Sequence, residues 1–147
     1  MNLDGDGDVD LDAHPLTGAP IGVSSQPPGC CADTFGMLSF QRLDVYQRAI
    51  EFLAVVYEIV ENVPRGHAER CDQLVRAAES TVRNIAEGAG RWSDADSSKH
   101  YKIARGEAME SAASLDVMKL RRLVANERYE RGVHLLEGVV AMLTKML

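Results

Sequence analysis

The amino-acid sequence predicts an all-α protein, an antiparallel up-down four-helix bundle preceded by a disordered N-terminal leader. Apolar residues recur at helical spacing in four successive segments between Phe40 and the C-terminus. The connections between these segments are short, which is typical of antiparallel helices that pack as neighbours. Aromatic residues make up only 5% of the chain, so the predicted core consists mainly of aliphatic side chains.

The first two predicted helices have recognisable ends. The first runs from about Phe40 to Asn62 and stops before Pro64, because proline disfavours helical backbone in the residue ahead of it. Its apolar residues form two stripes, Leu43, Tyr46, Ile50, Leu53, Tyr57 and Val60 in one, and Ala49, Phe52, Val56, Ile59 and Val63 in the other. The second helix runs from about His67 to Ala89, where nearby glycines stop it. Its inner stripe is formed by Leu74, Ala78, Thr81, Ile85 and Gly88.

The third and fourth predicted helices also carry two apolar stripes each. Ser93 is expected to cap the third helix, with Asp96 in the capping-box position, and this helix continues to about Val124. Its stripes are Tyr101, Ala104, Ala108, Ala112 and Leu115, and then Ile103, Ala113, Val117, Leu120 and Val124. Asn126 is expected to cap the fourth helix, which runs to the C-terminus. Its stripes are Tyr129, Val133, Leu136, Val140 and Leu143, and then Leu135, Val139, Met142 and Met146.

The double stripes predict self-association. One apolar face of about 100° is enough for a helix in an isolated bundle, and the first, third and fourth helices exceed it. A second buried surface between subunits explains the excess. The alternative is one wide core face with scattered exposed apolar residues, which is common in monomeric proteins.

Charge divides the chain at Met37. Six of the 22 acidic residues precede Met37, where there is no lysine or arginine, and the other 16 are balanced by all 16 basic residues. We therefore predict an acidic, Gly/Pro-rich disordered leader at residues 1–37 and a near-neutral bundle at residues 38–147. An alternative interpretation of the abrupt change in composition is that translation starts at Met37.

The leader offers one metal-like pattern. The segment that begins at Asn2 resembles part of a calcium-binding loop, but Ala13 occupies the position that needs a bidentate glutamate, and a solvated acidic tail is the simpler interpretation. Cys30, Cys31 and Cys71 are odd in number, and we interpret them as free thiols in a reducing cytoplasm. The sequence shows no secretory signal and no apolar run long enough to span a membrane.

Enzymatic chemistry and cofactors find little support in the sequence. A di-iron bundle needs Glu-x-x-His pairs, and none of the four histidines (His14, His67, His100, His134) follows a glutamate by three residues. Glu130 and His134 are four residues apart and are expected to form a surface pair that supports the helix. No Cys-x-x-Cys, P-loop or Ser/His/Asp pattern stands out. We predict a non-enzymatic protein without catalytic residues, metal or cofactor.

A polar stripe follows one face of the second helix. Ser80, Asn84, Glu87 and Arg91 recur at helical spacing. One interpretation is structural: a solvated face or an interhelical hydrogen-bond network that fixes the register of the bundle. The other is functional, because the same residues would suit a partner- or ligand-binding site on the surface. We favour the structural role, since mid-helix Asn and Glu commonly specify packing in bundles.

Basic residues gather near two of the interhelical turns. The candidates for nucleic-acid contact are Arg83, Arg91, Lys99, Lys102 and Arg105 near the second turn, and Lys119, Arg121, Arg122 and Arg128 near the third. Such clusters bind phosphates through sequence-independent electrostatics. Lysine and arginine also solvate helix surfaces and complement helix dipoles at C-terminal ends. Because no aromatic residues interleave with these basic ones, base-specific recognition is not expected.

Three segments together resemble the four-helix bundle family encoded in intervening sequences of bacterial 23S ribosomal RNA genes. They are FQRLDVYQRA at 40–49, LVRAAESTVRNIAEGAGR at 74–91 and ARGEAME at 104–110. The resemblance covers about residues 38–124, and the last helix fits in type only. One departure is Glu107, which follows Gly106 where the family usually has a serine; a small residue there would allow closer helix approach.

The resemblance implies a bundle that associates into a ring-like homopentamer. Relatives include the accessory protein of diversity-generating retroelements, a strongly basic partner of nucleic acid and reverse transcriptase. The implied function is therefore an accessory role bound to RNA or to a ribonucleoprotein such as a reverse-transcriptase complex. The alternative is a structural or protein–protein interaction bundle that binds no nucleic acid, and the near-neutral charge of residues 38–147 favours this alternative.

Overall fold

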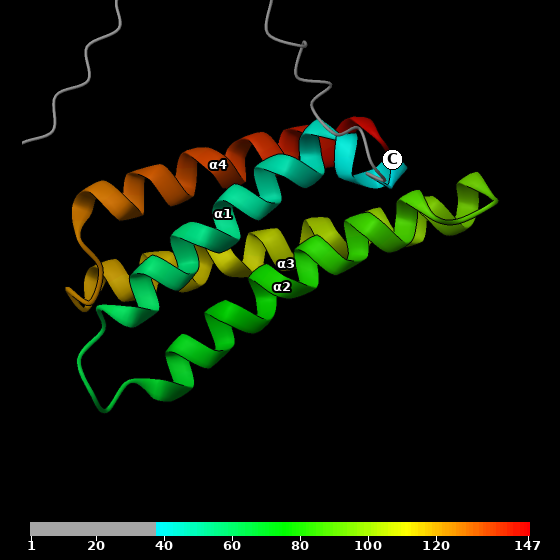
Figure 1. The fold of residues 1–147 in the computed structure, drawn as a ribbon. Helices are drawn as coiled ribbons and strands as arrows, with labels where there is room; N and C mark the ends of the chain where they lie inside the picture. Colours follow the sequence, from blue (N-terminus) through cyan, green and yellow to red (C-terminus); the bar gives the residue numbers. More distant parts are fainter. Residues whose placement is uncertain (1–37) are drawn as a thin grey trace, which may run out of the picture. The chain divides into compact units, whose positions relative to one another are not determined.

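The computed structural model describes residues 38–147, which contain four α-helices and one short 3-10 helix and no β-strand. These elements are η1 (Ser39–Arg42), α1 (Asp44–Glu61), α2 (Ala68–Ala89), α3 (Asp94–Leu120) and α4 (Asn126–Lys145). Each helix packs against the next along the chain, and α4 returns to α1, so α1 and α3 lie diagonally across the bundle (Figure 1). The predicted all-α four-helix fold is confirmed. The predicted leader, with its calcium-like segment, Cys30, Cys31 and the possible start at Met37, lies outside the described residues.

The core is built mainly from aliphatic side chains of all four helices, as the composition predicts. Its largest fully buried members include Phe52 and Ile59 of α1, Leu115 of α3 and Leu143 of α4. The inner stripe predicted for α2 is buried along its whole length. Its one polar member, Thr81, donates its hydroxyl hydrogen to a backbone carbonyl of its own helix at 3.0 Å, so no hydrogen-bonding group is left unsatisfied there.

Helices α2 and α3 approach each other closely near the turn that joins them. The ring of Tyr101 on α3 lies against the backbone of Gly88 on α2, where a Cβ atom would come within 2.6 Å of the ring carbon Cε1. Tyr101 is buried at this contact, and burial raises the pKa of its hydroxyl above the ordinary value. A glycine is therefore required here by the space that a neighbouring ring occupies.

Helix ends were predicted less well than helices. The first helix begins at Asp44 rather than Phe40, because the chain first makes the short helix η1 and then an extended residue, Leu43. The predicted Ser93 cap is confirmed: its Oγ accepts a hydrogen bond from the backbone N–H of Asp96 at 3.2 Å. The predicted Asn126 cap is wrong, since Asn126 is the first residue of α4 and its amide donates to Glu130 at 2.6 Å.

The third helix ends at Leu120, four residues earlier than predicted. Arg122 adopts a positive φ of 58°, and the next residue, Leu123, donates its N–H to the carbonyl of Met118 at 2.9 Å. This is a Schellman motif, in which the left-handed position is usually a glycine. Because an arginine occupies that position, nothing in the sequence marks the end of the helix.

The two apolar stripes are buried to different extents in different helices. Both stripes of α4 face the bundle interior, so the wide-core alternative applies to this helix. The stripe of α1 that contains Ile50 and Tyr57 and the stripe of α3 that contains Ile103 and Val117 instead remain partly exposed. Their most exposed large members are Ile50 and Tyr57 on α1 and Ile103, Val117 and Leu120 on α3. Apolar surface beyond what the core buries is therefore exposed on α1 and α3 but not on the stripes of α4.

Candidate nucleic-acid interface

The predicted basic residues lie at two opposite ends of the bundle. One end, called here the α2–α3 end, contains the connection at residues 90–93 and the adjoining helix turns. The other, called the α3–α4 end, contains the connection at residues 121–125 together with the α1–α2 connection at residues 62–67 (Figure 1). Helix α3 joins the two ends and separates Lys102 from Lys119 by about 25 Å, at 1.5 Å per residue. One subunit therefore presents two basic patches and not one.

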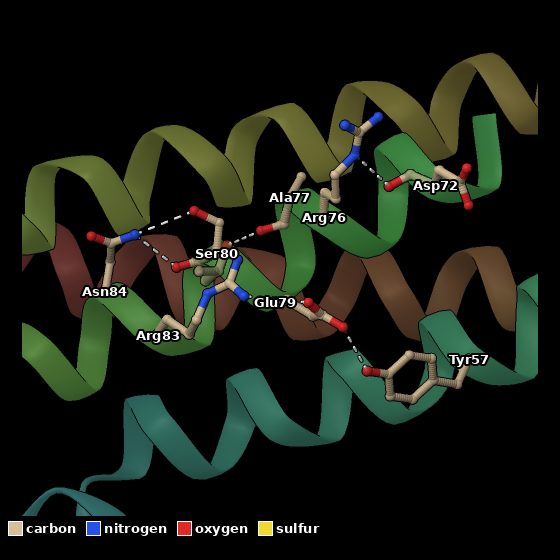
Figure 2. A network of polar contacts seen from close by, with 9 residues as sticks. Tyr57, Asp72, Arg76, Ala77, Glu79, Ser80, Arg83 and Asn84 are labelled. Carbon is tan, nitrogen blue, oxygen red and sulfur yellow. Dashed lines mark hydrogen bonds and ion pairs between the residues drawn. The ribbon is translucent and has the colours of Figure 1, made fainter. Parts of the chain in front are cut away.

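The polar stripe forms a network at the α2–α3 end, and a residue of α3 completes it. The side-chain amide of Asn84 donates to the backbone carbonyl of Ser80 at 2.9 Å and contacts its hydroxyl at 3.3 Å (Figure 2). The Oδ1 atom of Asn84 lies 3.3 Å from Nδ1 of His100 on α3. Glu87 forms an ion pair with Arg91, and its Oε1 lies 3.9 Å from Nε2 of His100. The stripe thus links two helices, as expected for the structural role.

His100 is a member of this network that sequence reasoning missed. It precedes Tyr101, and the ring of Tyr101 is fixed against Gly88. That packing orients α3 so that His100 faces the polar stripe of α2. The available signal was its position beside a core aromatic residue in the first turns of α3.

Several basic residues towards the α2–α3 end are already bound to other side chains. Arg83 forms an ion pair with Glu79 at 3.5 Å, and Glu79 also accepts a hydrogen bond from the hydroxyl of Tyr57 at 3.1 Å (Figure 2). The bond to Glu79 raises the pKa of the Tyr57 hydroxyl, because it stabilises the protonated form next to a negative charge. Arg91 is paired with Glu87, and Arg105 donates to the Thr144 hydroxyl at 3.0 Å. The remaining predicted residues, Lys99 and Lys102, are exposed and have no ion-pair partner within residues 38–147.

The α3–α4 end is organised differently. Arg121, Arg122 and Arg128 have no carboxylate within 4.0 Å among the residues that the structure describes. Arg122 and Arg128 line a hollow of about 300 Å³, whose other walls are the end of α1 and the α3–α4 connection. Lys119 is engaged, since its Nζ lies 3.7 Å from the centre of the Tyr129 ring. The hydroxyl of Tyr129 donates to Asp116 at 2.7 Å, which raises its pKa.

A groove with a polar and a more apolar part runs between α2 and α3. Two adjoining hollows of about 490 and 330 Å³ share Gln73 and Glu110 as lining residues. Glu107, the departure from the family pattern, lines the larger hollow with Arg76 and Arg83. It is half-buried at the side of the helix contact. Carboxylates and guanidinium groups alternate along this groove, so it presents no single sign of charge to a ligand.

The structure also shows an aromatic residue that sequence reasoning overlooked. Trp92 stands in the α2–α3 connection, directly after Arg91, with a relative exposure of 105%. The expectation that no aromatic residue interleaves with the basic ones is wrong at this position. The signal was present in the sequence: the only tryptophan of the chain lies between a helix-ending glycine and the N-cap Ser93, where no core face exists to bury it.

The structure also bears on the predictions about metal ligands, membrane-spanning helices, the Glu130–His134 pair and Cys71. Within residues 38–147, no cluster of three His, Cys, Asp or Glu side chains is arranged to hold a metal ion. None of the helices in this part of the chain combines the length and apolar character needed to cross a membrane. The expected Glu130–His134 pair does not form, since Glu130 is bound to Asn126 instead. Cys71 is a half-buried free thiol, and its burial, followed by the charge of Asp72, raises its pKa.

The described residues form an all-α four-helix bundle, with the predicted basic residues distributed towards its two ends. The sequence profile of the 23S rRNA-intervening sequence protein family matches residues 41–145, and the chain belongs to this family. A solved structure from Bacteroides thetaiotaomicron, a protein of unknown function from the S23 ribosomal protein family, has the same fold. It shares 22% sequence identity with a TM-score of 0.64, and the match covers 69% of this chain and 96% of that one. No curated protein gives a significant match.

Proposed function

We propose that this protein is an oligomeric, non-enzymatic accessory module that associates in the cytoplasm with RNA or with a ribonucleoprotein, such as a reverse-transcriptase complex. The observation that carries the proposal is the placement of its unpaired basic residues. Lys99 and Lys102 lie at the α2–α3 end, and Arg121, Arg122 and Arg128 lie at the α3–α4 end. Each contact with a phosphate releases a condensed counterion, so even a near-neutral subunit gains affinity where its positive charges are concentrated.

The charge pattern of the described residues supports this placement. Between residues 119 and 131 there are five lysine or arginine residues and two glutamates, and between residues 83 and 105 five basic residues stand against three acidic ones. Since acidic and basic residues are equal in number after Met37, the rest of the bundle carries the compensating negative charge. A nucleic acid is thus attracted to the ends and repelled by the middle.

The exposed apolar residues support self-association as part of the proposal. Those of α1 and those of α3 lie on different helices and form two separate sets. Contacts between two different surfaces are head-to-tail, and they close into a ring when the rotation per subunit permits. The homopentamer implied by the family resemblance is such a ring. It repeats a weak basic patch several times and so multiplies affinity through avidity.

Two measurements on the full-length protein test this proposal. Light scattering coupled to size-exclusion chromatography is expected to give an oligomer, and a monomer at micromolar concentration contradicts the assembly. Fluorescence anisotropy with mixed-sequence RNA is expected to show binding at low salt that weakens steeply as salt rises. Absence of binding at tens of micromolar subunit removes the RNA association.

A second function is favoured by one specific observation. Ile103, Val117 and Leu120 are exposed apolar side chains of α3, and exposed apolar surface also suits a protein partner. In that case the protein is a structural or protein–protein interaction bundle. The genomic position separates the two functions: a site inside a ribosomal RNA gene, or beside a reverse transcriptase gene, supports the RNA-associated role.

A further inference from the structure

Trp92 is the one aromatic side chain of the described residues that contributes nothing to the fold. Its relative exposure is 105%, whereas Phe52 and Tyr101 are buried, and Phe40 packs edge-on against Tyr46 with ring centroids 4.9 Å apart. A tryptophan carries a large apolar surface that normally finds a partner. A fully exposed one is therefore available for a contact outside the subunit.

The turn that carries Trp92 is well held. At the end of α2, the N–H of Gly90 donates to the carbonyls of Ala86 and Glu87 at 3.2 and 3.1 Å. At the start of α3, the hydroxyl of Ser93 accepts from the N–H of Asp96 at 3.2 Å and donates to its carboxylate at 2.9 Å. Trp92 lies between these two caps, so its backbone is fixed while its ring faces solvent. Binding therefore does not have to order the backbone of this turn, which limits its entropic cost.

The surroundings of Trp92 favour a nucleobase over a protein pocket. Residues 90–98 contain no other large apolar side chain, whereas a tryptophan that anchors a protein interface normally lies within a ring of packed neighbours that excludes water. A nucleobase needs only the face of the indole ring, because base–aromatic stacking depends little on neighbouring groups. Because Trp92 has no large apolar neighbour in this segment, it meets the requirement for stacking a base better than the requirement for anchoring a protein interface.

The positive charges near Trp92 suit the phosphate backbone of a nucleic acid strand whose base stacks on the indole ring. Lys99 and Lys102 are exposed and three residues apart, so they share one face of α3. They lie about 8 and 12 Å along the helix from its first residue, within reach of successive phosphates next to a stacked base. Of the three acidic groups in this region, Glu87 is paired with Arg91 and Asp96 is bound to Ser93, whereas Asp94 is exposed at the first residue of α3.

We propose that Trp92 is a stacking platform for an unpaired base of single-stranded RNA, with Lys99 and Lys102 contacting phosphates of the same strand. The inference rests on the proposed function and deepens it, because it names unpaired RNA as the ligand of the α2–α3 end. Bases inside a duplex are already stacked on their neighbours, and only unpaired bases are free to leave the helix and stack on protein. The α3–α4 end, which has arginines but no aromatic ring as exposed as that of Trp92, contacts phosphates of either form.

Trp92 is the only tryptophan in the chain, so intrinsic tryptophan fluorescence reports on this site alone. The full-length protein is titrated with an unstructured RNA of about 12 nucleotides, a length within the range of single-strand binding sites, and with a duplex of the same length. Anisotropy of labelled RNA measures binding independently. We expect the single strand to quench Trp92 emission with the same midpoint as the anisotropy change, and the duplex to bind without quenching.

Substitutions complete the test. Trp92→Ala is expected to weaken single-strand binding by about 5- to 100-fold and to leave duplex binding unchanged, while Trp92→Phe retains part of the affinity. Met109→Ala is the matched control, because Met109 is also an exposed apolar residue of α3, at 52%, but lies far along the helix from Trp92 and belongs to neither of its two apolar stripes. It is expected to change neither. Circular dichroism verifies that each variant keeps its helices.

Three results overturn the inference in distinguishable ways. RNA binding by anisotropy without quenching, or with Trp92→Ala at wild-type affinity, removes the stacking site and leaves the proposed function intact. Absence of RNA binding by any form removes the proposed function and the stacking site together. A blue shift of Trp92 emission with rising protein concentration, in the absence of RNA, places the ring in a contact between subunits and contradicts the inference.

Discussion

The two ends of the bundle carry similar numbers of basic residues but hold them in different states. Towards the α2–α3 end, Arg83, Arg91 and Arg105 are bound to side chains of the protein itself. At the α3–α4 end, Arg121, Arg122 and Arg128 have no carboxylate partner within residues 38–147. A count of lysines and arginines in a segment therefore overstates the positive charge available to a partner, because helical i,i+4 ion pairs neutralise part of that charge.

The ends also differ in how tightly their helices pack. At the α2–α3 end, the Tyr101 ring fills the space that a side chain at position 88 would need, 2.6 Å from its Cβ. Near the α3–α4 end, a Cβ at position 132 of α4 would lie 3.1 Å from a methyl group of Leu115, a contact that a small movement relieves. The α2–α3 end is thus more rigidly specified by packing.

The largest expected effect on stability comes from Gly88→Ala. Overpacking against a buried ring costs about 1–3 kcal/mol, and three atoms of the rigid Tyr101 ring lie within 3.1 Å of the added Cβ, so the ring must move as a whole. Gly106→Ala is the matched control: it is also helical, and a Cβ there meets nothing within 4 Å. It is expected to stabilise the protein by about 1 kcal/mol through helix propensity. Urea unfolding at one protein concentration measures the difference between the two variants.

Gly132→Ala sharpens the comparison between the ends. Its cost is expected to be smaller than that of Gly88→Ala, because the Leu115 methyl group can shift by a few tenths of an ångström. Equal costs at positions 88 and 132, in the same urea experiment, would contradict the difference in packing between the ends.

The next effect is expected at Arg122. This residue holds φ at 58°, where a side chain is strained and glycine is not. Arg122→Gly should therefore raise the free energy of unfolding by up to about 1 kcal/mol, while removing one cation and weakening RNA binding. Arg121→Gly is the control, since φ at Arg121 is −83° and glycine relieves no strain there. A loss of stability in Arg122→Gly refutes the interpretation of this position as strained.

The smallest effect concerns the polar network. A double-mutant cycle between Asn84→Ala and His100→Ala is expected to give a coupling energy of about 0.5–1 kcal/mol, because the two side chains are 3.3 Å apart and neutral hydrogen bonds contribute about that much. No coupling in thermal or urea unfolding would mean that the stripe does not join α2 to α3. That result would favour the interpretation of the polar stripe as a partner-binding site.

Most of the fold followed from periodicity, and most of the site geometry did not. The buried face of α2, from Leu74 to Gly88, has the regular spacing that a one-dimensional pattern records. The end of α3 was missed because Arg122 occupies a left-handed position that the sequence would signal only with glycine or asparagine. A break at Leu43 was equally invisible, since leucine is a good helix former.

The candidate site shows the same division. The basic residues are evident from the sequence, but which of them are free is not. Pairing depends on rotamers and on distant neighbours such as Thr144, which lies 39 positions away from Arg105 along the chain. Trp92 and His100 were also missed. The sequence holds a signal for each, but the exposure of Trp92 and the interhelical contact of His100 are established only by the structure.

The central claim is that free cations at the bundle ends bind RNA, and a pair of charge reversals tests it most directly. Arg121→Glu with Arg122→Glu is compared with Lys99→Glu with Lys102→Glu in anisotropy titrations over a range of salt concentrations. The first pair is expected to weaken binding to unrelated single strands and duplexes alike by about tenfold or more, with a shallower salt dependence. The second pair is expected to weaken single-strand binding preferentially. If neither pair changes affinity while helicity and oligomer mass stay constant, the bundle ends do not bind RNA and the account is contradicted.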